Sequence, residues 1–156
     1  MKKLFLAALL TVAFSAQAQW ATITTKDAMT DAVTRTAWQL SPTVVRLKLP
    51  YEGATAVRLY VRRDRIWLAS NDGQILPGEG IVFRFDDEPP VTVEAVGTAS
   101  GSSRQVYVAD DELADELASR IVAAKRLRVR VVFFENGERV LEFSPKGLKL
   151  AEKPAG

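Results

Sequence analysis

The chain contains neither cysteine nor histidine. Without cysteine it cannot form disulfides, thiolate nucleophiles or cysteine-ligated zinc sites. Without histidine it lacks the commonest general base near neutral pH, the commonest metal ligand and every Ser-His nucleophile arrangement. The serines near cations, in residues 102–104 and 144–146, have neither Ser-x-x-Lys spacing nor a Gly-x-Ser-x-Gly turn. We therefore predict a protein that is not an enzyme and binds no cofactor or metal.

Long apolar runs are also scarce, and the clearest one lies at the N-terminus. Lys2 and Lys3 precede an apolar stretch from Leu4 to Phe14, and Ala16-Gln17-Ala18 supplies the small residues typical of a cleavage site. We predict a signal peptide over residues 1–18, cleaved after Ala18. The alternative is a retained N-terminal anchor, although the stretch is shorter than the roughly 20 residues that span a bilayer. An exported chain in a Gram-negative cell is periplasmic.

Excess charge is absent once the signal peptide is removed. The whole chain has 21 basic and 19 acidic residues, and the loss of Lys2 and Lys3 leaves 19 of each. A neutral chain gives no electrostatic reason to expect nucleic acid as a partner. The rest of the 156 residues suffice for one domain, which we place at residues 19–150, followed by a frayed tail over 151–156. No later segment is long and apolar enough to cross a membrane.

Short segments of alternating or β-branched residues, separated by turn residues, predict strands through most of the chain. Residues 71–73 form a strong turn signal, and we expect a loop over 74–80. Together these segments predict a mainly β (α+β) fold, an antiparallel sheet or β-sandwich with one late amphipathic helix. The expected strands are residues 20–24, 32–40, 43–49, 57–62, 66–70, 81–85, 91–96, 105–108, 127–133 and 140–143.

The late helix and the hairpin after it carry the strongest pattern. Asp110, Asp111 and Glu112 suit a helix N-terminus, which offers free amides and a positive partial charge. Leu113, Leu117, Ile121 and Ala124 recur at helical spacing, and Lys125-Arg126 follow at the other end. Asn136-Gly137 is the preferred central pair of a type I′ turn, which predicts a β-hairpin there.

Asp86, Asp87 and Glu88 form the densest carboxylate cluster in a predicted loop. Hard cations such as Ca²⁺ take oxygen ligands, but the cluster has no EF-hand spacing, and adjacent carboxylates in a strand point to opposite faces. The favoured interpretation is a polar strand end terminated by Pro89 and Pro90, which cannot donate to a ladder.

Basic residues occupy the polar positions of several predicted strands. If those strands share one sheet, they form a cationic face suited to phosphate or carboxylate groups. The alternative is a solvated face with cross-strand partners such as Glu94 and Glu142. The basic residues are Arg46, Lys48, Arg58, Arg62, Arg84, Arg128 and Arg130, and the candidate ligand-binding residues are Arg58, Tyr60, Arg62, Arg128 and Arg130.

Four short motifs resemble a pattern found in small exported bacterial proteins. They are Trp20, Asp27-x-Met29-Thr30-Asp31, Arg84-Phe85-Asp86-Asp87 and Phe143-x-x-x-Gly147-Leu148-x-x-Ala151. Many proteins of this kind are uncharacterised, and some resemble accessory proteins associated with type VI secretion. The resemblance implies a periplasmic β-rich domain with a late helix, and it carries over no catalytic residues.

These observations favour a periplasmic, non-enzymatic binding or accessory protein. Its partner is then an envelope protein or an anionic envelope ligand held on the cationic face. One alternative is an inhibitor or regulator of a cell-envelope enzyme, which presents a protruding loop such as Asn71–Gly80. Another is a small carboxylate-dependent hydrolase that uses the Asp86 cluster in an apolar cleft.

Overall fold

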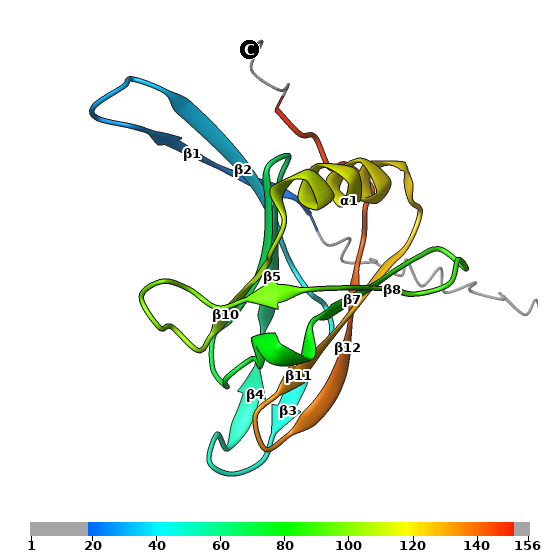
Figure 1. Cartoon of the computed structure of the whole chain (residues 1–156). Coiled ribbons are helices and arrows are strands. Elements are labelled where there is room, and N and C mark those ends of the chain that lie inside the picture. The colour runs from blue at the N-terminus through cyan, green and yellow to red at the C-terminus, as the bar shows by residue number, and fades with distance from the viewer. Residues whose placement is uncertain (1–18, 152–156) are drawn as a thin grey trace, which may run out of the picture.

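The computed structural model describes residues 19–151, and this part of the chain forms twelve strands, a short 3₁₀ helix and one α-helix (Figure 1). The predicted signal peptide and residues 152–156 of the predicted tail lie outside the described residues. The elements are β1 (Ala21–Lys26), β2 (Val33–Leu40), β3 (Val45–Leu47), β4 (Gly53–Thr55), β5 (Val57–Arg62), β6 (Arg65–Ser70), η1 (Pro77–Glu79), β7 (Ile81–Phe85), β8 (Val91–Val93), β9 (Ala95–Val96), β10 (Gln105–Val108), α1 (Asp111–Ala123), β11 (Leu127–Phe133) and β12 (Gly137–Phe143).

The strands of residues 19–151 form two main sheets and a small hairpin. The larger sheet has six strands in the order β1-β2-β5-β6-β10-β9, and the second has four in the order β12-β11-β7-β8. The β3–β4 hairpin forms a separate pair, and neighbouring strands run antiparallel in all three. The prediction of a mainly β, antiparallel fold with one late helix is confirmed.

The inward sides of the two main sheets share one hydrophobic core. Alternation along β5 buries Val57, Leu59 and Val61, and alternation along β11 buries Leu127 and Val129. Side chains on successive strand residues point to opposite faces, so β5 and β11 each lend one face to the core and the other to solvent. Helix α1 covers one end of the sandwich, and the β3–β4 hairpin lies towards the other (Figure 1).

Helix α1 begins as the acidic residues predict. The Asp110 carboxylate is the N-cap and accepts a hydrogen bond of 2.7 Å from the Leu113 amide. Asp111 and Glu112 lie in the first turn, where the helix dipole favours negative charge. Leu117 and Ile121 are buried on the face towards the core. The apolar residues that recur at helical spacing in the sequence therefore form the face of α1 that packs on the core.

The predicted strand over residues 91–96 is two strands in two different sheets. Val91–Val93 pairs with β7 in the four-stranded sheet, whereas Ala95–Val96 pairs with β10 in the six-stranded sheet. Glu94 is the residue between them, and its carbonyl accepts the Ala109 amide at 3.0 Å. The chain therefore crosses from one sheet to the other at this edge of the sandwich.

The β11–β12 turn differs from the predicted type I′ turn. Phe133 pairs with Gly137, so three residues, Phe134 to Asn136, form the loop. The positive φ angles fall at Glu135 (58°) and Gly137 (72°). Asn136 is instead buried, and its Oδ1 accepts the Lys48 amide at 2.6 Å. A contact with a hairpin distant in sequence has replaced the local turn preference.

The loop over residues 71–80 does not project, so it is not the protruding loop expected of an inhibitor. Ile75 is 1% exposed and forms a β-bridge with Phe133. Its amide donates to the Ser103 carbonyl at 2.8 Å. Gly73 is also buried, and a Cβ there would lie 2.5 Å from Leu47 Cδ1. The apolar side chain in this polar-looking segment fixes the loop against the core.

The projecting element is the β1–β2 hairpin. Strand β1 pairs with β2 from Val33 to Trp38, but β5 pairs with β2 only from Ala37 to Leu40. Residues 22–36, which we call the arm, therefore extend beyond the body of the sheet (Figure 1). Met29 at the tip is 93% exposed. The strand predicted to end at Thr24 runs on to Lys26 in this arm.

Candidate functional site

Three of the five predicted ligand-binding residues lie together on the outer face of the six-stranded sheet. Arg58, Tyr60 and Arg62 alternate along β5 with residues that point into the core. All three are half-buried, because neighbouring side chains on the same face cover their stems. The alternation read from the sequence correctly places them on one face.

Four aromatic residues cross this face in a line, which we call the aromatic row: Trp38, Tyr60, Trp67 and Tyr107. In register, Trp38 lies opposite Tyr60, Tyr60 opposite Trp67, and Trp67 opposite Tyr107. The ring centroids are 6.3, 4.7 and 5.6 Å apart along the row, and the Tyr60 and Trp67 planes differ by 1°. A centroid spacing of about 4.7 Å is that of neighbouring strands, so the parallel Tyr60 and Trp67 rings stand upright and present their edges to solvent.

The row offers hydrogen-bond donors and positively polarised ring edges. An aromatic ring carries negative charge on its faces and positive charge at its edge. Within residues 19–151, the Trp38 and Trp67 indole N–H groups and the Tyr60 hydroxyl have no protein hydrogen-bond partner. The Tyr107 hydroxyl donates to Gln105 Oε1 at 2.9 Å. This arrangement favours a ligand that is rich in acceptor oxygens.

Arg58 flanks the row on one side and keeps its positive charge uncompensated. Its Nη1 donates to the neutral Asn71 Oδ1 at 2.8 Å, and its Cζ lies 5.7 Å from the centroid of the Trp38 ring. No carboxylate pairs with this guanidinium among the residues that the structure describes. Arg58 is therefore available to an anionic group laid along the row.

Arg62 flanks the row on the other side and is paired with Asp64. Its Nη2 donates to Asp64 Oδ2 at 2.8 Å, and its Nε bonds the second oxygen, which makes the contact bidentate. Partial burial raises the pKa of Asp64, but the hydrogen bond and charge of Arg62 outweigh burial and the pKa is lowered. Arg62 is thus neutralised at neutral pH, in contrast to Arg58.

A hollow of about 350 Å³ lies beside the row, between the arm and the sheet face. Its walls combine threonine hydroxyls with one carboxylate, one guanidinium and one indole. The Asp27 carboxylate accepts the amides of Thr30 and Met29 at 2.8 Å, and these bonds lower its pKa. The lining residues are Ile23, Thr25, Asp27, Thr34, Thr36, Arg62 and Trp67.

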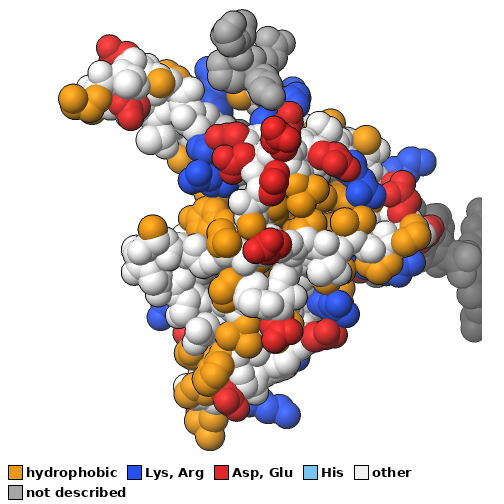
Figure 2. Space-filling model, in the orientation of Figure 1, with side chains coloured by type: hydrophobic (Ala, Val, Ile, Leu, Met, Phe, Trp, Pro, Cys, Tyr) orange, Lys and Arg blue, Asp and Glu red, His pale blue; other side chains and the backbone are white. Residues whose placement is uncertain are grey.

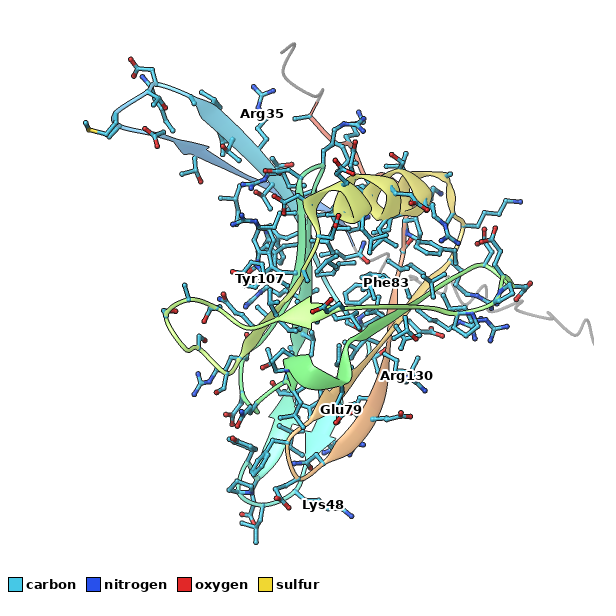
Figure 3. All side chains as sticks on the ribbon, viewed as in Figure 1. Arg35, Lys48, Glu79, Phe83, Tyr107 and Arg130 are labelled. Carbon is cyan, nitrogen blue, oxygen red and sulfur yellow. The ribbon has the colours of Figure 1, made fainter. Side chains whose placement is uncertain are left out.

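Arg128 and Arg130 do not join this face, so the prediction of one continuous cationic face is wrong. Strand β11 pairs with β7 and β12, which places both residues on the four-stranded sheet. Tyr107 and Arg130 lie well apart on their separate sheets (Figure 3). Arg128 Nη2 donates to the Asp86 carbonyl at 3.1 Å, and Arg130 pairs with Glu138 at 3.3 Å. Both guanidiniums are engaged by neighbouring groups of the four-stranded sheet and its β7–β8 turn.

The other basic residues are divided in the same way. Arg84 lies opposite Arg128 in the four-stranded sheet and donates to the Glu88 carbonyl at 3.1 Å. Arg46 belongs to the β3–β4 hairpin, which is a third sheet, and Lys48 follows that strand. Glu142 lies directly opposite Arg128, so on the four-stranded sheet the alternative of a solvated face with cross-strand partners fits better.

The Asp86 cluster fastens the β7–β8 turn to the end of α1. One Asp86 oxygen accepts the amides of Lys125 and Arg126 at 2.9 and 2.8 Å. Asp87 pairs with Arg126 and Glu88 pairs with Arg120, both at 2.7 Å. Within residues 19–151, no group of three acidic side chains is arranged to hold a metal ion. The turn therefore has a structural explanation for each carboxylate.

A second hollow of the described surface is acidic. It has a volume of about 540 Å³ and lies at the start of α1, where carboxylates from the helix and from Glu94 face it. Figure 2 shows acidic side chains gathered over α1, above an apolar area. Because like charges repel, this end of the molecule is unsuited to the anionic ligand that the aromatic row favours. The lining residues are Glu94, Ala109, Asp110, Glu112, Leu113 and Glu116.

Sequence reasoning missed Trp38, Trp67 and Tyr107 as members of the site. The signal was present, because each aromatic residue occupies a polar-side position of a strand that the pattern predicted. What could not be read locally is that β6 lies next to β10, some 40 residues further along the chain, which brings Trp67 against Tyr107.

Comparisons of the chain with family models, with curated proteins and with solved structures find no match. The resemblance to small exported proteins stays a prediction. Within residues 19–151, helix α1 is too short and too polar to span a bilayer.

Proposed function

We propose that this is a non-enzymatic periplasmic binding protein, which holds an anionic envelope ligand on the outer face of its six-stranded sheet. The observation that carries the proposal is the aromatic row with Arg58 beside it. The ligand is an extended molecule that bears carboxylate or phosphate groups. Its oxygens accept from the outward donors of the row, and its charge is balanced by Arg58.

The dimensions of the row favour a ligand with several repeating units. The ring centroids follow one another at 6.3, 4.7 and 5.6 Å across four adjacent strands, so the row can contact a few consecutive units of a polymer. Upright rings expose edges rather than faces, which argues against sugar rings stacked flat on the surface and for edge-on polar contacts. The face is open, so we expect modest affinity with a strong dependence on ionic strength.

The structure lends less support to the two alternatives. The hydrolase requires free carboxylates in a cleft, whereas Asp86, Asp87 and Glu88 are bound by amides and arginines. The inhibitor was expected to present residues 71–80, and that loop packs on the core.

Binding can be tested by titration of the mature chain with ligands of known charge. A carboxylated polysaccharide such as polygalacturonate is compared with neutral dextran and with vesicles that contain phosphatidylglycerol. Tryptophan fluorescence is the readout, because Trp38 and Trp67 lie in the row. We expect a signal that falls as salt rises, with polygalacturonate or with the vesicles, which distinguishes a glycan from a lipid source. Neutral dextran should give no signal.

Variants separate the proposed face from general charge effects. Arg58→Gln combined with Arg62→Gln should weaken binding about tenfold, since the charge-assisted contact of Arg58 is lost and Asp64, left without Arg62, repels an anionic ligand. Arg130→Gln removes an exposed arginine of the other sheet and is the matched control, with affinity unchanged. Trp67→Phe keeps a stacked ring but loses the indole donor, and should weaken binding to a smaller extent. Equal affinity of the double variant and the wild type would overturn the proposal.

A further inference from the structure

Among residues 19–151, β1 pairs with β2 alone, so the arm carries an outer strand edge with a defined set of backbone groups. In a strand of an antiparallel pair, the N–H and C=O of one residue point towards one neighbour and those of the next residue point away. The Asp27 amide donates to the Ala32 carbonyl at 2.8 Å, across the arm. With the continuous register of β1 against β2, Thr25 and Ile23 also face β2. Thr22, Thr24 and Lys26 therefore present their backbone groups at the outer edge.

The arm has little packing of its own to hold it. All of β1 after Ala21 is exposed, and β5 does not pair with β2 before Ala37. An isolated two-stranded hairpin is marginal in water, and three or more strands are needed for independent stability. A further strand paired at the β1 edge would supply the third strand that an independently stable sheet requires.

The edge also lacks the features that keep strand edges from pairing. Such edges are usually blunted by proline, inward charges, bulges or a covering element. Residues 21–25 are Ala, Thr, Ile, Thr and Thr, without charge or proline. The charge at Lys26 is itself neutralised by Asp31, 2.7 Å away across the arm.

The same edge is complementary to itself. If two copies pair antiparallel about a two-fold axis at Thr24, then Thr22 of each copy faces Lys26 of the other and Asp27 faces Ala21. No like charges are opposed, and Thr24 meets Thr24 in a cross-strand pair, which is a favourable combination. Each of the three outward residues exchanges two hydrogen bonds, about six in all. A two-fold axis makes such an interface isologous and closed.

We propose that the mature protein forms a dimer with a second copy of the chain through the β1 edges of the two arms. The two hairpins become one four-stranded antiparallel ribbon, and the two six-stranded sheets become continuous. A single strand pair buries less than the roughly 1,200 Å² of a stable interface, so the dimer is weak and concentration-dependent. The ligand proposed for the aromatic row is not needed for this pairing.

Cysteine crosslinking tests the geometry directly, because the chain has no cysteine of its own. Thr24→Cys places one thiol at the two-fold axis, where hydrogen-bonded strand residues lie about 5.5 Å apart between Cα atoms and a disulfide can form. We expect a covalent dimer of the full mature chain under mild oxidation. The matched control is Val140→Cys, since Val140 is 51% exposed on the outer face of the other sheet, and it should stay largely monomeric.

Sedimentation equilibrium from about 5 µM to 1 mM tests the pairing without a crosslink. Thr24→Pro removes an outward N–H and leaves the β1–β2 bonds intact, because proline is tolerated on an edge strand. It should abolish self-association. Ala28→Pro puts proline in the turn at the tip of the arm and should leave self-association unchanged. A wild-type chain that stays monomeric to 1 mM refutes the proposal. So does a dimer that survives Thr24→Pro, or equal crosslinking through Val140→Cys.

Discussion

Replacement of Gln39 by methionine tests how the two main sheets are joined at the base of the arm. Gln39 is fully buried on β2, and its side chain bonds the backbone of Ser144, just past β12. Its Oε1 accepts the Ser144 amide at 2.8 Å, and its Nε2 donates to the Ser144 carbonyl at 3.0 Å. The pair of bonds acts as a bridge between the six-stranded and four-stranded sheets.

The structure sets the size of the expected loss. Methionine has a similar volume, so it breaks both bonds with little change in packing. The Ser144 carbonyl keeps the Trp20 indole as a donor at 2.8 Å, and its loss is one ordinary hydrogen bond of about 0.5–1.5 kcal/mol. The amide is left without its acceptor, which costs about 1–3 kcal/mol. We therefore expect a loss of about 2–4 kcal/mol in the free energy of unfolding.

Urea unfolding of residues 19–156 measures this loss. At an m value of about 2 kcal/mol/M, the midpoint should fall by about 1–2 M without a change in m. Trp20 donates to the same Ser144 carbonyl, so its fluorescence reports on the bridge. Gln39→Glu is the matched variant: burial favours the neutral carboxyl, so this variant should be least stable at neutral pH and recover as pH falls. A midpoint shift below about 0.3 M for Gln39→Met refutes the bridge as a major contact.

Three further predictions concern the face, the core and the arm. Asp64→Asn frees Arg62 and should tighten binding of polygalacturonate about two- to fivefold, in keeping with the 0.2–1 kcal/mol of an exposed ion pair. Gly73→Ala forces a Cβ against Leu47 at a φ of +81°, and it should cost about 2–4 kcal/mol in thermal unfolding. The pKa of Asp27 is lowered, so its contribution to stability is present above its ordinary pKa and is lost as pH falls through the lower folded value. Amide NMR should show that the order of the tip disappears only below the ordinary pKa of an aspartate.

The prediction placed residues correctly on one side of a single strand, but it did not identify which strands share a sheet. Alternation with period two is local, so Arg58, Tyr60 and Arg62 could be placed on one side of β5 from their neighbours alone. Which strands lie side by side depends on contacts between distant segments. Strand β11 pairs with β7 and not with β5, so Arg128 and Arg130 lie on the other sheet. The strands that do lie beside β5 and β6 carry the aromatic residues of the row.

The two turn predictions show the same limit. Asn136-Gly137 has the local preference of a type I′ turn, but the buried amide of Asn136 bonds the backbone of Lys48, 88 residues away. Residues 71–80 are rich in turn formers and read as a loop, and only Ile75 hints at the burial that the bridge to Phe133 requires. At Asn136 a contact with a remote segment outweighs the local turn preference. Residues 71–80 do form the predicted turn and loop, and the remote contact of Ile75 decides only that this loop packs on the core.

The sequence by itself determined the β-rich class of the fold, the extent and capping of α1 and the core-facing side of the alternating strands, such as β5 and β11. These properties depend on neighbours within a few residues, where periodicity, side-chain branching and capping act. Only the tertiary structure decided the strand order, the division of the arginines between two sheets, the aromatic row and the length of the arm. Each of these depends on which distant strands pair, and strand pairing is chosen by packing of the whole core.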